Sequence, residues 1–130
     1  MSNNQLVTHN DASILEIPSY HTINTSLSFK LPRSVFSKYE IYETITNFIN
    51  FQKKNNTLIT NNFYYNNFKW KCIFNDVYLQ IFGIGTLRTE VSMQLWKDNE
   101  NNYILEFNCL CGDRKKVFNF YRKLFNLFDI

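Results

Sequence analysis

A stretch of alternating apolar and polar residues, from residue 68 to residue 111, most constrains the fold of this chain. The segment "FKWKCIFN", which begins at Phe68, alternates aromatic or thiol side chains with lysines. The same two-residue period returns in "LRTEVSMQLWK" and "YILEFNCLC". Successive side chains of a strand point to opposite faces, so this period is typical of strands with one buried face. The sequence therefore predicts an antiparallel meander with one apolar and one mostly polar face.

Turn signals divide this region into four expected strands. The pair Asn75-Asp76 predicts a tight hairpin between "FKWKCIFN" and "VYLQIFG". Gly83 and Gly85 interrupt the chain before the third strand, and "DNENN" turns the third strand into the fourth. A further strand is expected earlier, at residues 26–31, because "SLSFKL" also alternates before Pro32 ends it.

Two amphipathic helices complete the expected order. Ser34 is expected to cap a helix that ends near Lys53, and Asp113 to cap a last helix after Gly112. Between the first helix and the meander, "KKNNTLITNNFYYNN" is polar and turn-prone, with a short apolar patch. The expected core stripe of the last helix comprises Val117, Phe118, Tyr121, Leu124, Phe125 and Phe128.

The predicted order is therefore β-α-β-β-β-β-α. Each element has one apolar face, so both helices are expected to pack side by side on one face of an antiparallel sheet of four to five strands. This is a two-layer α+β domain. A chain of 130 residues suits one domain, which we expect at residues 26–130, after a Ser-, Thr- and Asn-rich flexible leader at residues 1–25.

The sequence lacks the signals that usually mark catalysis or cofactor binding. There is no phosphate-binding loop, dinucleotide glycine fingerprint or zinc-hydrolase helix. The two histidines lie in the leader, and Cys72, Cys109 and Cys111 do not supply a four-ligand metal set. We therefore expect no catalytic residue, metal or cofactor, and three free thiols. No apolar run is long enough to span a bilayer, so a cytoplasmic location is expected.

Three consecutive cations at residues 114–116 open the last predicted helix. The start of a helix is partly positive, so cations there cost a few tenths of a kcal/mol each, up to about 1. The arrangement makes physical sense if an anion binds, since free helix amides already attract phosphate and carboxylate. Neutralisation by Asp113 and nearby acids is the alternative. The candidate anion-binding residues are Arg114, Lys115, Lys116, Lys69 and Lys71, the last two on one strand face.

Two stretches near the end of the chain carry a resemblance to a known family. They are "VSMQLWKDNENNYILEF" at residues 91–107 and "GDRKKVFNFYRKLFNLF" at residues 112–128. The first resembles a strand, turn and strand in the C-terminal domain of the AMP-activated kinase catalytic subunit. The second is similar to the Gly-Asp and amphipathic last helix common in kinase-associated-1 domains. The likeness in element order covers roughly residues 26–128.

The resemblance implies a non-catalytic regulatory domain of a serine/threonine protein kinase. Several such domains bind anionic phospholipids such as phosphatidylserine, which brings the kinase to the inner face of the plasma membrane as a peripheral protein. They can also hold the kinase domain inactive. Many lipid-binding members carry a Lys-Arg pair just before the Gly-Asp, where this chain has "EFNCLC". The resemblance therefore places the lipid contact on residues 114–116, Lys69 and Lys71.

Two other classes of binding domain remain open from the residues. One is a protein-interaction domain that docks a kinase domain or regulatory subunit through the exposed sheet face, including Ile73 and Trp96. The other binds nucleic acid, with bases stacked on Trp70, Phe74 and Tyr78 near Lys69 and Lys71. The aromatic residues follow the apolar period, however, and most are expected in the core. Nucleic acid is therefore not expected as the partner.

Overall fold

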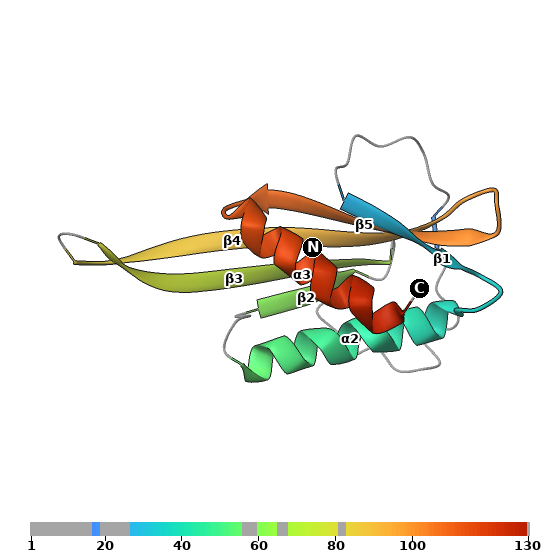
Figure 1. Ribbon diagram of the computed structural model, residues 1–130, viewed down its shortest axis with the longest axis horizontal. Helices are drawn as coiled ribbons and strands as arrows, with labels where there is room; N and C mark the ends of the chain where they lie inside the picture. Colours follow the sequence, from blue (N-terminus) through green and yellow to red (C-terminus); the bar gives the residue numbers. More distant parts are fainter. Residues whose placement is uncertain (1–16, 19–26, 56–59, 65–67, 81–82, 130) are drawn as a thin grey trace.

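The computed structural model describes residues 17–18, 27–55, 60–64, 68–80 and 83–129. Most of the predicted leader lies outside these residues. The described chain is a two-layer α+β domain, as predicted, with both helices on one face of an antiparallel sheet (Figure 1). Its elements are β1 (Leu27–Pro32), α2 (Lys38–Lys54), β2 (Thr60–Tyr64), β3 (Lys69–Gln80), β4 (Gly83–Lys97), β5 (Asn102–Cys111) and α3 (Arg114–Phe128).

The sheet has five strands in the order β1-β5-β4-β3-β2. The first strand thus lies beside the last one, with Phe29 opposite Leu105. The β3–β4 hairpin is the longest pairing and extends past both helices in Figure 1. The sheet therefore has a part covered by helices and a projecting part.

The predicted hairpin at Asn75-Asp76 is wrong. β3 continues through both residues, with Asn75 opposite Arg88 and Asp76 opposite Leu87. The chain reverses farther along, between the paired residues Gln80 and Gly83. A local turn preference is weak compared with an uninterrupted ladder of hydrogen bonds to a long partner strand.

The strand number in the predicted order is nevertheless right, because β2 supplies the missing strand. β2 lies in the stretch predicted to be polar and turn-prone, and it pairs with the start of β3. Strand formation depends on the neighbouring strand more than on composition, so a polar segment beside an open edge can become a strand.

The first helix begins three residues later than predicted. Ser37, and not Ser34, caps α2: its hydroxyl accepts a hydrogen bond from the Glu40 amide at 3.1 Å. The Glu40 carboxylate accepts in turn from the Ser37 amide at 3.1 Å. This reciprocal capping box satisfies two backbone donors, which explains the preference for Ser37.

The core lies between the helices and the sheet face that carries Trp70, Cys72 and Phe74. The predicted core stripe of α3 is wrong at one position: Phe120, and not Phe118, belongs to the core. Phe118 is 44% exposed, whereas Phe120, which the sequence did not assign to the core, is 4% exposed. The two residues lie at opposite edges of the same apolar stripe, and only packing decides which edge is buried.

Candidate anion-binding surface

The junction between β5 and α3 fixes where the cations lie. Gly112 has a φ of 93°, a left-handed conformation that favours glycine. Asp113 then caps α3, since its carboxylate accepts a hydrogen bond from the Lys115 amide at 2.9 Å. The Asp113 amide donates to the hydroxyl of Thr89 at 3.0 Å, which ties the helix start to β4. The cations therefore occupy the first turn of α3, as predicted.

Arg114 and Lys115 are exposed at this helix start. Neither forms an ion pair with an acid in the described part of the chain. Their charges reinforce the positive end of the helix dipole and face solvent. Arg114 and Lys115 therefore remain candidate anion-binding residues at the start of α3.

Lys116, the third cation, is engaged within the fold. Its ammonium lies 2.8 Å from a carboxylate oxygen of Asp76 and 5.3 Å from the centre of the Phe74 ring. Its side chain is 23% exposed. Because β3 runs straight through Asp76, this carboxylate reaches the start of α3. The alternative that nearby acids neutralise the cluster thus applies to Lys116.

Lys69 and Lys71 lie on the opposite face of the sheet. Their neighbours along β3, Trp70 and Cys72, are buried beneath the helices, and alternation directs the lysines away from them. The Lys71 ammonium lies 3.7 Å from a carboxylate oxygen of Glu90. The structure therefore separates these two lysines from the cations of α3.

Glu90 also binds Arg88, whose guanidinium donates a hydrogen bond at 2.7 Å. This bond is the main reason that the pKa of Glu90 is lowered; the smaller effects of the Cys111 thiol and the Lys71 charge act in the same direction. At a pH above the ordinary range of carboxyl pKa values, Glu90 is charged and attracts both Lys71 and Arg88. Glu90 therefore offsets part of the positive charge of Lys71 and Arg88 on the outer face.

A surface that the sequence analysis missed runs along α3. Arg114, Phe118 and Arg122 are spaced by four residues, so they share one side of the helix. The exposed Phe118 ring lies between the two arginines, and the Arg122 guanidinium is 5.9 Å from its centre. We call Arg114, Lys115, Phe118 and Arg122 the α3 basic face. The spacing is visible in the sequence, but assignment of Phe118 to the core concealed it.

The outer sheet face gives less support to the predicted docking surface. Ile73 and Trp96 are both half-buried there. Their neighbours Ser92, Gln94 and Glu106 are 3%, 7% and 3% exposed. A partner could therefore reach little of this part of the face.

No protein-family model, curated protein or solved structure matches the chain. The resemblance to kinase-associated-1 domains thus stays a hypothesis that rests on two motifs and the order of elements. Among the described helices, none combines the length and apolar character needed to cross a bilayer. Within the same residues, no group of three or more His, Cys, Asp or Glu side chains is placed to hold a metal ion.

Proposed function

We propose that this chain is a non-catalytic regulatory domain, of the kinase-associated-1 kind, that binds anionic phospholipid membranes through the α3 basic face. In this proposal it forms part of a serine/threonine protein kinase in the cytoplasm. It brings that kinase to the inner face of the plasma membrane, and membrane binding competes with an autoinhibitory contact to the kinase domain.

The observation that carries the proposal is the exposed Phe118 ring between Arg114 and Arg122. Cations at a membrane surface attract acidic headgroups, and an adjacent aromatic side chain can enter the interface. Lys115 adds a third positive charge beside Arg114, in the first turn of α3. The combination of charge and exposed apolar surface distinguishes this face from an ordinary solvated helix.

The expected affinity is low and sensitive to salt. Each cation near an anionic surface contributes about 1 kcal/mol, and burial of the exposed part of Phe118 adds about 1 kcal/mol. The total of about 4 kcal/mol corresponds to a dissociation constant near 1 mM. Such binding is reversible, and it supports membrane recruitment together with other contacts of the whole kinase.

Sedimentation with lipid vesicles tests the proposal. The chain is expected to bind vesicles that contain phosphatidylserine more strongly than vesicles of phosphatidylcholine alone, and salt should weaken this binding. Replacing both Arg114 and Lys115 with Ser removes about 2 kcal/mol, so the partition coefficient should fall about thirtyfold.

The double variant Lys38→Ser/Lys54→Ser is the matched control, because it removes two positive charges from α2. It is expected to retain most of the binding. Equal binding to both kinds of vesicle, or the same loss in the control, would refute the proposal. Phe118→Ser should lower the binding that persists at high salt, where charge attraction is screened.

The predicted alternative is a domain that docks a kinase domain or regulatory subunit through the outer sheet face. The outer sheet face is largely buried around Ile73 and Trp96, but the helical layer offers a different surface for a protein partner.

A further inference from the structure

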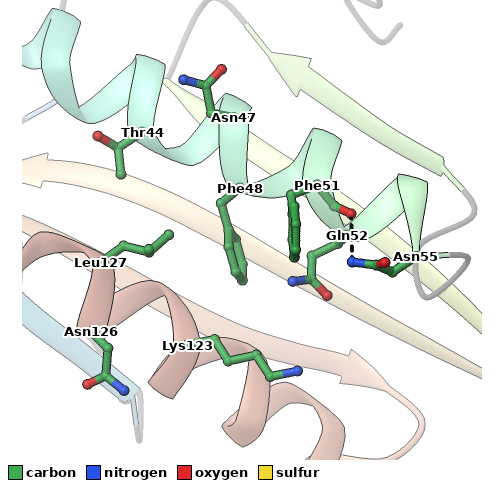
Figure 2. A pocket seen from close by; sticks show the side chains of 9 residues that line it. All are labelled: Thr44, Asn47, Phe48, Phe51, Gln52, Asn55, Lys123, Asn126 and Leu127. Atoms are coloured by element: carbon green, nitrogen blue, oxygen red, sulfur yellow. Dashed lines mark hydrogen bonds between the residues drawn. The ribbon is translucent and has the colours of Figure 1, made fainter.

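A groove with a volume of about 750 Å³ runs between α2 and α3 (Figure 2). Phe48, Phe51 and Gln52 point into it from α2, and Lys123 and Leu127 project from α3 (Figure 2). The ring of Phe48 lies 4.9 Å from that of Phe120, between centres. This buried pair joins the helices, and Phe48 also lines the groove.

Two of the side chains that line the groove are large, apolar and exposed. Phe51 is 61% exposed and Leu127 is 55% exposed, and they flank the groove from opposite helices (Figure 2). Neither contributes to the core. In Figure 2 Leu127 lies opposite Thr44 and Phe51 lies farther along the groove, toward Lys123. Two large exposed apolar side chains at separate points of a groove provide the kind of anchor points that partner proteins bury.

The charge of the groove has one sign. Among the described residues that line it, Lys123 alone is charged; the others are apolar, amide or hydroxyl side chains. A smaller cavity of about 120 Å³ shares Gln52 and Lys123 with it and continues to Lys116. A negatively charged group beside Lys123 would therefore meet no acid from the groove lining.

The form of the groove favours a helix as its occupant. The lining residues of α2 and its C-cap run from Thr44 to Asn55, which corresponds to about 17 Å, or three helical turns. An extended peptide gains affinity from backbone bonds to a sheet edge, but the edge strands here are β1 and β2 and the groove is lined by helices. A small ligand needs closer enclosure than two exposed walls provide.

We infer that this groove binds an amphipathic helix of a partner protein, with apolar residues between Phe51 and Leu127 and an acidic residue beside Lys123. The bound helix lies beside α2 and α3 and extends the described helical layer. The groove is independent of the membrane proposal, because Lys123 and Leu127 lie on a different side of α3 from Arg114, Phe118 and Arg122.

Two synthetic peptides of about 16 residues, enough for four turns, test the inference with the whole chain. Both carry leucines at positions i, i+3, i+4 and i+7; one has Glu on the flanking positions and the other has Lys. Fluorescence anisotropy of labelled peptides measures the dissociation constants. The Glu peptide is expected to bind at least tenfold more tightly than the Lys peptide, and Lys123→Glu is expected to reverse this order.

Variants of the walls locate the binding. Phe51→Ser and Leu127→Ser are each expected to weaken the Glu peptide at least tenfold. Val35→Ser and Leu110→Ser are the matched controls, since these residues are 61% and 51% exposed outside the groove. Thermal unfolding verifies that every variant is folded.

The inference is wrong if neither peptide binds at millimolar concentration, if both peptides bind equally, or if binding survives Phe51→Ser. Displacement of the Glu peptide by phosphatidylserine vesicles would instead identify the groove as a lipid site and would also overturn it. The two proposals fail separately, because the Arg114→Ser/Lys115→Ser variant should lose vesicle binding and keep the peptide.

Discussion

At the scale of single residues, Glu106 is the least expected side chain of the sheet. It lies on the outer face and is 3% exposed. One carboxylate oxygen accepts a hydrogen bond from the Asn108 amide at 3.1 Å, and the other has no hydrogen-bond partner among the described residues. Its cross-strand neighbour Gln94 donates to backbone carbonyls instead. A buried carboxylate with an unsatisfied oxygen lowers stability.

Replacing Glu106 with Gln is therefore expected to raise the free energy of unfolding by about 1 kcal/mol, because the amide keeps the shape and removes the charge. Urea denaturation should show a higher midpoint and an unchanged slope. Glu100→Gln is the control: its side chain is 77% exposed, and a change below about 0.5 kcal/mol is expected. A clear loss of stability in Glu106→Gln would mean that a cation pairs with Glu106, contrary to this account.

At the scale of elements, the junction of β5 and α3 depends on Gly112. A Cβ atom at this position would collide with the carbonyl oxygen of Arg88 and lie 2.5 Å from the Cα of Thr89. The φ of 93° adds backbone strain for any other residue. The close approach brings β4 beside the start of α3, where Thr89 binds Asp113.

Gly112→Ala is expected to lower the free energy of unfolding by about 3 kcal/mol or more, because backbone atoms must move to admit the methyl group. Gly83→Ala is a suitable comparison: its φ is 147°, and a Cβ there meets nothing within 4 Å. We expect a loss near 1 kcal/mol for Gly83→Ala. Similar losses in the two variants, measured by urea denaturation, would show that the collision at Gly112 is relieved at little cost.

The elements also show where sequence patterns succeed and fail. Asp113 was recognised as a cap because a capping residue acts on amides two or three positions away. The predicted turn at Asn75-Asp76 is instead part of β3, and β2 was not predicted. Both differences arise because strand pairing involves residues far apart in the chain. Local preferences therefore identified the helices better than the strand boundaries.

At the scale of the whole molecule, Phe120 joins the two layers. Its ring centre lies 4.9 Å from that of Phe48, 5.3 Å from that of Phe74 and 6.3 Å from that of Phe107. These rings belong to α2, β3 and β5. The Phe120 side chain of α3 therefore packs against α2 and against two strands, β3 and β5.

Phe120→Ala is expected to lower the free energy of unfolding by about 3 to 5 kcal/mol, since a large cavity forms at this meeting point. Phe118→Ala, its matched partner on the same helix, should cost less than about 1 kcal/mol because the ring is 44% exposed. Urea denaturation of both variants measures the difference. A larger loss for Phe118→Ala would restore the core assignment made from the sequence and contradict the packing described above.

The sequence by itself determined the class of fold and the place of the cations. Periods of two and of three to four residues define elements with one apolar face, and such elements pack in two layers. Asp113 sets the first turn of the last helix, so residues 114–116 had to open it. The expectation of an anionic partner also came from the residues alone, and the vesicle experiment tests it.

Only the tertiary structure decided which side chains are free to bind. Lys116 is paired because Asp76, forty residues earlier, lies beside it, and Lys71 is paired because Glu90 is on the next strand. Tertiary packing also exposed Phe118 and opened the groove between α2 and α3. The physical reason is that a periodic pattern describes one element, whereas ion pairs and grooves depend on contacts between elements distant in the chain.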